Sequence, residues 1–334
     1  MKTRICFSLI IVIALVLAVA SACKSDSAKT LTLVAADDGW DSQKFHNAMA
    51  KIVIEHAYDG YKLEFSTASS TMNWQSLKGN DVDLCIEQWI DTIPTYEDDL
   101  KNGEIIVQSV IVEDSYQGIY VPRYVVEGDP SRGLPPLTPD LKRIEDLTKY
   151  AHVFPDDEDH SRGRLYGSIP GWMTDAVLYK RYLNLGLDKH YNYVRLGSEA
   201  ALFLSLASAY NLGEPWVGYC YEPTWVIGKL DMIRLEDVPY DPIPFLEGKT
   251  GFSTQELLNI SSRNFPEKSP EILQFIQKYK TSSSLLSSAL AYLDESKATH
   301  EAAAIWFLKN NDSIIDNWVP PANAAKLRAY LSKK

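Results

Sequence analysis

The sequence is poor in the residues that build metal sites and disulfide frameworks. Its 334 residues include only four cysteines and six histidines. It has no His-Glu-x-x-His motif and no cysteine pair at metal-ligand spacing, which argues against a zinc site. Gly248-Lys249-Thr250 matches the end of a phosphate-binding loop, but Ile243 stands where that motif needs glycine, and no Gly-x-Ser-x-Gly elbow occurs. We therefore expect neither a metal nor a cofactor.

Positive charge is also scarce. The chain has 33 lysines and arginines against 44 aspartates and glutamates, a formal net charge of -11. This balance argues against nucleic acid or an anionic membrane surface as partner and favours a cationic or zwitterionic ligand. An acidic run at residues 156–160 has side chains suited to calcium, but a solvated acidic loop is the favoured interpretation.

Only one long apolar run is present, at residues 5–19. It follows Lys2 and Arg4, leads to the small residues 20–22, and is too short for a membrane span. Residues 1–22 are therefore predicted to be a signal peptide. The cysteine after them, Cys23, resembles the lipidated cysteine of bacterial lipoproteins, although Ala20 stands where leucine is usual. A plain secretory signal cleaved after Ala22 is the alternative, and residues 23–30 form a tether in either case.

The rest of the chain alternates strand-like and helix-like segments, which predicts an α/β fold with mainly parallel sheets. A first βαβαβ unit covers 31–89, and two further strands are expected at 104–112 and 118–126. A second alternation of helices and strands covers 141–221. The end of the chain is expected to be helical, with helices starting after a capping box at Ser253 and Glu256, at Pro270, and at 285–293, 302–308 and 322–331. Two α/β halves joined by extended strands predict two lobes with a cleft.

Two cysteines and two tryptophans are assigned to the interior. Cys85 and Cys220 each lie in an apolar strand a few residues before a tryptophan, so free buried thiols are favoured over a bridge. Trp306 and Trp318 lie among alanine, isoleucine and leucine in the helical end of the chain, which is typical of core positions.

Residues 217–225 combine a short apolar strand with aromatic and polar side chains at its end. Pro223 removes a backbone donor and ends the strand. In open α/β sheets, ligands bind at the carboxyl ends of strands. Three other predicted strands end near a tryptophan, so a pocket walled by ring faces competes with simple core packing as the interpretation. The residues concerned are Tyr221, Glu222, Thr224, Trp225, Trp40, Trp89 and Trp172.

Several motifs, taken in order, resemble the glycine betaine/choline-type substrate-binding proteins of ABC importers. They extend over nearly the whole mature chain. The motifs are Gly39-Trp40, Gly79-Asn80-Asp81-Val82-Asp83 before Glu87-Gln88-Trp89, Gly118-Ile119-Tyr120-Val121-Pro122, Pro170-Gly171-Trp172, and Tyr221-Glu222-Pro223-Thr224-Trp225 before residues 231–237.

The resemblance implies a two-lobed, type II periplasmic-binding-protein fold that closes around one small solute and delivers it to a permease. The expected lobes are 31–118 with 238–334, and 119–237. In that family an aromatic cage holds a quaternary ammonium, and backbone amides with a polar side chain hold a carboxylate. Carried over by position, the ligand-binding residues are Trp40, Trp89, Trp172, Tyr221, Trp225, Gly39, Gly171, Glu222 and Thr224.

Two positions depart from the family pattern. Many members have tryptophan where Tyr221 stands and histidine where Thr224 stands. Tyrosine offers a weaker face to a cation, and threonine replaces a charged donor by a neutral hydroxyl. Glu222 would favour choline or another net cation if it faces the pocket. The expected protein is a monomeric, lipid-anchored, extracytoplasmic binding protein with no enzymatic activity, serving a membrane permease and its ATPase.

Two other functions remain open from the sequence. In the first, Glu222 and an aspartate such as Asp38 or Asp175 form the acid pair of an extracytoplasmic hydrolase whose substrate stacks on the rings. In the second, the chain is a structural surface lipoprotein without a small ligand.

Overall fold

The computed structural model describes residues 30–334, and residues 32–334 form one compact unit. The predicted signal peptide and Cys23 lie outside the described residues. Eight strands of the described chain follow one mixed path in the order β2-β1-β3-β9-β4-β7-β5-β6, and β8 pairs with β4 beside this path. The strands are β1 (Leu31–Asp37), β2 (Tyr61–Thr67), β3 (Leu84–Gln88), β4 (Ile105–Pro122), β5 (Gly163–Tyr166), β6 (Tyr191–Val194), β7 (Gly218–Glu222), β8 (Met232–Arg234) and β9 (Gln255–Ser262).

Strand β4 belongs to two sheets. Its residues 105–115 pair antiparallel with β9, and its residues 116–122 pair antiparallel with β7 and β8. We call β2, β1, β3, β9 and the first part of β4 the first sheet, and the second part of β4 with β7, β5, β6 and β8 the second sheet. Each contains a parallel pairing, β1 with β3 and β5 with β6 and β7. The α/β prediction is confirmed, and the sheets are mixed because β4, β8 and β9 run antiparallel to their neighbours.

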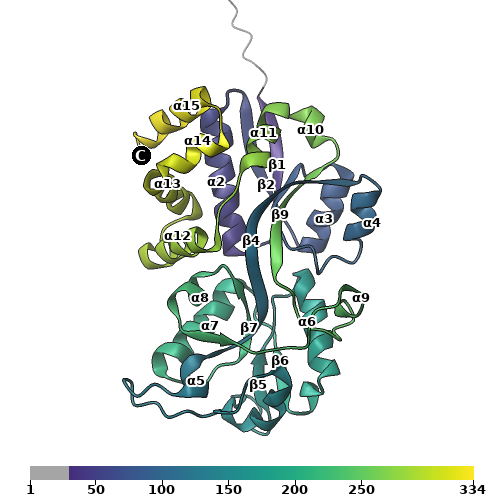
Figure 1. Ribbon diagram of the computed structural model, residues 1–334, viewed down its shortest axis with the longest axis vertical. Helices are drawn as coiled ribbons and strands as arrows, with labels where there is room; N and C mark the ends of the chain where they lie inside the picture. Colours follow the sequence, from purple (N-terminus) through teal and green to yellow (C-terminus); the bar gives the residue numbers. More distant parts are fainter. Residues whose placement is uncertain (1–29) are drawn as a thin grey trace, which may run out of the picture. The chain divides into compact units, whose positions relative to one another are not determined.

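Helices flank both sheets (Figure 1). Beside the first sheet lie α2 (Asp41–Ala57), α3 (Ser70–Gly79), α4 (Tyr96–Lys101), α10 (Phe265–Lys268), α11 (Pro270–Lys278), α12 (Ser283–Ser296), α13 (His300–Asn310), α14 (Ile315–Trp318) and α15 (Pro321–Leu331). Beside the second lie α5 (Arg123–Glu127), α6 (Met173–Asn184), α7 (Glu199–Leu212), α8 (Trp225–Lys229) and α9 (Pro242–Phe245). In the described part of the chain, no helix has the length and apolar character needed to cross a membrane.

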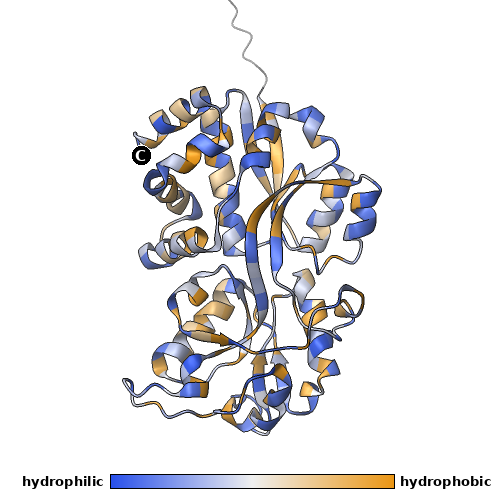
Figure 2. Cartoon of the chain, viewed as in Figure 1, coloured by the Kyte–Doolittle hydropathy of each residue, from blue (hydrophilic) through white to orange (hydrophobic). Residues whose placement is uncertain are grey.

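The core follows from apolar residues on the strands and on the helix faces that meet them. Figure 2 shows orange segments concentrated on the strands and on the inward sides of the helices. Leu33 and Ala35 on β1 are fully buried, as are Phe275 and Trp318 on the helices that follow β9. Trp318 is thus a core residue as predicted, whereas Trp306 is only partly buried, because its ring stacks on Tyr292 near the surface.

Two local predictions were wrong. The two strands expected at 104–112 and 118–126 are one strand, β4, which ends at Pro122, and residues 123–127 form the short helix α5. The helix expected from the capping box at Ser253 is strand β9 instead, because its side chains are buried on both sides between β3 and β4. Residues 144–149, within the alternation expected at 141–221, form a 3-10 helix.

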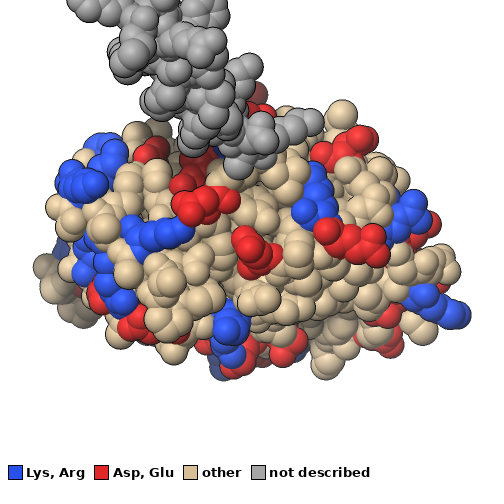
Figure 3. All heavy atoms as spheres, turned by 90° about the horizontal axis from the view of Figure 1, so that it is seen from above, with Lys and Arg blue, Asp and Glu red and all other residues tan. Residues whose placement is uncertain are grey.

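Cys85 and Cys220 are both buried free thiols, so the prediction that they do not form a bridge is confirmed. Burial raises the pKa of both thiols well above the ordinary value. Both thiols therefore remain neutral and act as small apolar groups. Charge on the surface is mixed: the face in Figure 3 shows acidic and basic side chains interspersed.

Candidate functional site

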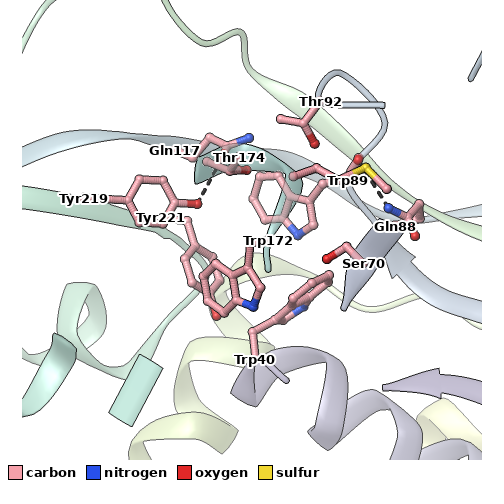
Figure 4. Close-up of a pocket in the computed structure, with 11 residues that line it drawn as sticks. Trp40, Ser70, Gln88, Trp89, Thr92, Gln117, Trp172, Thr174, Tyr219 and Tyr221 are labelled. Atoms are coloured by element: carbon pink, nitrogen blue, oxygen red, sulfur yellow. Dashed lines mark hydrogen bonds between the residues drawn. The ribbon is translucent and has the colours of Figure 1, made fainter. Parts of the chain in front are cut away.

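One small pocket is lined by residues from both sheets and their helices. The space that the centre of a water-sized sphere can reach inside it is about 30 Å³. This is room for two or three waters, since one water needs roughly 10–15 Å³ on the same measure. Figure 4 shows its lining, which is Trp40, Ser70, Gln88, Trp89, Thr92, Gln117, Trp172, Met173, Thr174, Tyr219 and Tyr221. The pocket is compact and suits a small solute.

Four aromatic rings predicted from the sequence come together here. Trp89 and Tyr221 meet edge to face with ring centroids 5.7 Å apart, and Trp40 and Trp172 do the same at 5.5 Å. Trp172 also lies 6.0 Å from Tyr221, which links the two pairs into one wall. Edge-to-face contacts are a favoured aromatic geometry, so the rings hold one another in place.

Each ring owes its place to the end of a strand or the start of a helix. Trp40 is the residue before α2, and Trp172 is the residue before α6; neither helix has a side-chain cap at that position. Tyr219 and Tyr221 lie two apart on β7, so both rings point to the same side of the sheet. The pocket therefore adjoins the N-terminal ends of two helices, where backbone N–H groups lack intrahelical partners.

The backbone before Trp89 is unusual. Glu87 has a φ of 66°, a left-handed conformation that is costly for a residue other than glycine. The pairing of β3 with β9 is irregular between Cys85 and Gln88, around this residue. A bulge of this kind redirects the side chains that follow it, and such strain is found at functional sites. Here it turns Gln88 and Trp89 into the pocket.

Gln117 supplies a polar group to an otherwise aromatic wall. Its Oε1 accepts hydrogen bonds from Thr174 Oγ1 at 3.2 Å and Tyr219 OH at 2.9 Å. Within residues 30–334 its buried Nε2 has no hydrogen-bond partner. A buried donor without a partner costs about 1–3 kcal/mol, so an acceptor on a bound ligand would relieve that cost. The lining residues found in the described chain are all uncharged.

Two buried glutamates lie behind the rings. Glu87 Oε1 accepts hydrogen bonds from Trp40 Nε1 at 3.2 Å and Ser42 Oγ at 2.6 Å. Glu199 accepts from the hydroxyl of Tyr221 through Oε1 and from the backbone N–H of Asp41 through Oε2, at 2.6 Å. Burial raises the pKa of both carboxyl groups to about 8, although the hydrogen bonds from Ser42 and Tyr221 act in the opposite direction.

The remaining residues named from the sequence lie outside the pocket lining. Glu222 faces away, since its carboxylate accepts a hydrogen bond from Tyr120 OH at 2.8 Å. Thr224 is the N-cap of α8, and its hydroxyl is bonded to the backbone of Tyr221 and Ile227. Trp225 packs against Phe203, with ring centroids 6.3 Å apart. These three flank Pro223, where the chain turns from β7 into α8, and none of their side chains is in the pocket lining.

The two glycines are next to the pocket without lining it. Gly39 and Gly171 have φ values of 102° and 96°, which only glycine adopts readily, so each serves the turn that places the tryptophan after it. The Gly171 carbonyl accepts a hydrogen bond from the backbone N–H of Ser70 at 3.2 Å. This contact joins the start of α3, beside the first sheet, to the turn before α6, beside the second.

The acid pair of the hydrolase hypothesis is not assembled. Asp38 is hydrogen-bonded to Asn73 at 2.6 Å, and burial raises its pKa to about 6. Asp175 forms an ion pair with Arg195 at 2.9 Å, and Glu222 is held by Tyr120. The lining contains none of the three carboxylates among the residues described. The described chain also has no cluster of three or more potential metal ligands.

Sequence reasoning missed part of the lining and both glutamates behind it. Tyr219 has a usable signal, because it lies two residues before Tyr221 on the same strand, and Met173 and Thr174 directly follow Trp172. Gln88 has a similar signal, because it directly precedes Trp89. Ser70, Thr92 and Gln117 have none, since only the folded structure brings them to the rings. The missed lining residues are Ser70, Gln88, Thr92, Gln117, Met173, Thr174 and Tyr219.

Comparison with known proteins places this geometry in context. The trimethylamine N-oxide-binding protein of Pelagibacter ubique (strain HTCC1062) is 24% identical over 286 residues, covering 82% of this chain and 88% of that protein. The solved glycine betaine/L-proline-binding protein of Borrelia burgdorferi is 18% identical with a TM-score of 0.71, over 89% of this chain and 100% of the other. A choline-binding protein solved with choline is 18% identical with a TM-score of 0.72, over 90% and 98%.

At these identities, the likeness to the two solved structures shows that this chain has the fold of periplasmic binding proteins. The family itself is shown by the sequence: the profile for the substrate-binding domain of ABC-type glycine betaine transport systems matches residues 30–310. Proteins of this family bind solutes for ABC transporters and are not enzymes. The chain belongs to the family of substrate-binding domains of ABC-type glycine betaine transport systems.

Proposed function

We propose that this chain captures a small methylated ammonium solute in the pocket formed by Trp40, Trp89, Trp172 and Tyr221, and delivers it to an ABC permease. The observation that carries the proposal is an aromatic wall without a charged side chain in the described lining. A methylated ammonium has no N–H to donate, so ring faces compete well with water for it. Each desolvated ring contributes roughly 0.5–2 kcal/mol.

The polar side of the pocket favours a solute that also carries an acceptor oxygen. Gln117 offers an unpartnered amide, and α6 begins with Met173 and Thr174, which line the pocket and belong to a first turn whose backbone N–H groups lack intrahelical partners. A cation at the rings and an oxygen at these donors describe a dipolar solute such as a betaine or an N-oxide. Choline, whose hydroxyl is the weaker acceptor, fits this arrangement less well.

We also propose how the chain is organised around the pocket. Lobe 1 would comprise 31–118 and 238–334, and lobe 2 would comprise 119–237. The membership of strands in the first and second sheets supports this division, with β4 continuing from one lobe into the other. Lipidation at Cys23 would hold a monomeric protein at the outer face of a membrane, beside its permease and ATPase.

Calorimetric titration tests the proposed ligand class. Glycine betaine, trimethylamine N-oxide, choline, carnitine and proline would be compared with a sugar and a dipeptide. We expect at least one methylated ammonium compound to bind with a Kd near the micromolar range, about -8 kcal/mol. Binding of only the sugar or the dipeptide would contradict the proposal. Turnover of an aryl glycoside, abolished by Glu222→Gln, would instead restore the hydrolase hypothesis.

A further inference from the structure

Two pocket rings each donate their polar hydrogen to a buried carboxyl group. Trp40 donates its indole N–H to Glu87, and Tyr221 donates its hydroxyl to Glu199. Glu87 is fully buried and Glu199 is 4% exposed. A ring that donates to a carboxylate gains electron density on its face, and that face attracts a cation more strongly.

The first turn of α2 brings the two acids together. Trp40 precedes this helix without a side-chain cap, Asp41 N–H donates to Glu199, and Ser42 Oγ donates to Glu87. The N-terminus of a helix carries partial positive charge, so it stabilises negative charge on both acids. One helix end therefore contacts both carboxyl groups that accept hydrogen bonds from the pocket rings.

Among the residues that the structure describes, no charged group near Glu87 stabilises its ionised form. Its Oε2 and His46 Nε2 are 3.8 Å apart, and neither atom has a hydrogen-bond partner in the described chain. His46 Nδ1 is bonded to Tyr279 OH at 2.7 Å, and burial lowers the pKa of His46 to about 3. Cys85 also faces Glu87 and is neutral. The neighbourhood thus lacks a cation to hold Glu87 ionised.

Glu199 has a similar environment. Asp41 repels negative charge on it, whereas Lys44 attracts that charge weakly. His300 Nε2 lies 3.2 Å from Asp41 Oδ1 and so reaches Glu199 only through Asp41. With a pKa of about 8, both Glu87 and Glu199 are largely protonated at neutral pH when the pocket is empty. A cation placed against the rings favours their ionised forms.

We propose that Glu87 and Glu199 are positioning residues that supply, through Trp40 and Tyr221, the counter-charge for the ammonium of the ligand, so that ligand binding releases protons. This inference rests on the proposed function. The direction of the pH dependence follows from linkage. A bound cation lowers the pKa of both carboxyl groups, so the affinity for the ligand rises with pH and levels off above about pH 8.

The test compares a cation with its uncharged analogue. Choline, which carries a fixed positive charge, and 3,3-dimethylbutan-1-ol, its neutral isostere, would be titrated into the unmodified protein by calorimetry. If one acid shifts by one to two pKa units, the Kd for choline is about tenfold higher at about pH 6.5 than at about pH 8.5. The neutral isostere should show no such dependence. Buffers of different ionisation enthalpy should reveal proton release with choline alone.

Substitutions identify the groups responsible. Glu199→Gln should weaken choline binding more than binding of the isostere and should flatten the pH profile; Glu87→Gln should do the same if it folds. Glu222→Gln is the matched control, because Glu222 also accepts a tyrosine hydroxyl hydrogen bond but lies outside the lining. It should leave the profile unchanged.

Two outcomes separate the inference from the function on which it rests. Choline or glycine betaine binding with the same affinity and no proton release across this pH range would overturn the inference alone. Equal losses for choline and its isostere in Glu199→Gln would also overturn it, since they would indicate a purely structural role. Failure of every methylated ammonium compound to bind at either pH would overturn the proposed function as well.

Discussion

Trp89 is the pocket ring that follows the strained residue Glu87, and it has its own contact with Tyr221 across the pocket. Trp89→Ala should raise the Kd for the bound solute about 10- to 100-fold, because one cation–π contact and its buried ring area are lost. Trp306→Ala is the control, since its ring stacks on Tyr292 and lies outside the pocket. Calorimetric titration of both variants checks this, and equal losses would contradict it.

Gln117 gives a second prediction at the same scale. Gln117→Met keeps the length of the side chain and removes the unpartnered amide. Glycine betaine binding should weaken about 10- to 100-fold, because a hydrogen bond to a charged group is worth about 1.5–3 kcal/mol. Tetramethylammonium, which has no oxygen, should bind almost as well as before. A similar loss for both ligands would mean that Gln117 only shapes the pocket.

The rings and their supporting groups differ in how far the sequence predicts them. Trp40, Trp89 and Trp172 each follow a recognisable strand end, so local pattern placed them near one site. In the sequence, Glu87 stands out only as part of the motif before Trp89, and Glu199 has no feature that marks it. Their importance depends on being buried beside a ring from a distant segment, 47 residues away for Glu87 and Trp40. Local sequence carries no signal for such a contact.

At the scale of elements, the start of α7 sets the position of Glu199. Ser198 caps this helix by accepting a hydrogen bond from Ala201 N at 3.2 Å. Ser282 caps α12 in the same way, with Leu285 N at 3.3 Å. Replacing either serine by alanine should cost about 0.5–2 kcal/mol of stability. Only Ser198→Ala should also weaken ligand binding, because Glu199 is the first residue of the helix it caps.

Thermal unfolding and calorimetry of Ser198→Ala and Ser282→Ala separate the two effects. Both variants should lose similar stability if the caps are equivalent. Unchanged affinity in Ser198→Ala, despite lower stability, would show that Glu199 keeps its position without the cap.

The two strands that the sequence predicted wrongly, β4 and β9, are neighbours in the first sheet. Strand β4 has eighteen residues, and polar residues in its middle interrupt the apolar pattern, which made it read as two strands. Strand β9 includes the buried polar residues Asn259, Ser261 and Ser262, so its apolar alternation is weak. Asn259 Nδ2 is satisfied by Ser109 Oγ at 2.9 Å, a partner on the neighbouring strand. Tertiary pairing therefore overrode the local helix signal at Ser253.

At the scale of the molecule, a few polar contacts bridge the elements of the two sheets around the pocket. Trp172 Nε1 donates to the carbonyl of Asp38 at 3.1 Å, and the N–H groups of Asp41 and Ser70 donate to Glu199 and to Gly171. If the proposed lobes close on a ligand, these bonds form only in the closed state. The ligand then stabilises that state by binding energy, about 2.7 kcal/mol at a concentration of 100 Kd.

Amide hydrogen exchange measures this coupling directly. In the presence of saturating ligand, the amides of Asp41 and Ser70 should exchange at least about tenfold more slowly than without it, because each loses its partner when the lobes separate. The amide of Ser262, bonded to the Asp83 carbonyl at 3.0 Å within the first sheet, is the internal control and should change little. Equal slowing at all three amides would indicate general stabilisation instead. Unchanged rates at Asp41 and Ser70 would mean that the bridging bonds persist without ligand and that binding does not depend on closure.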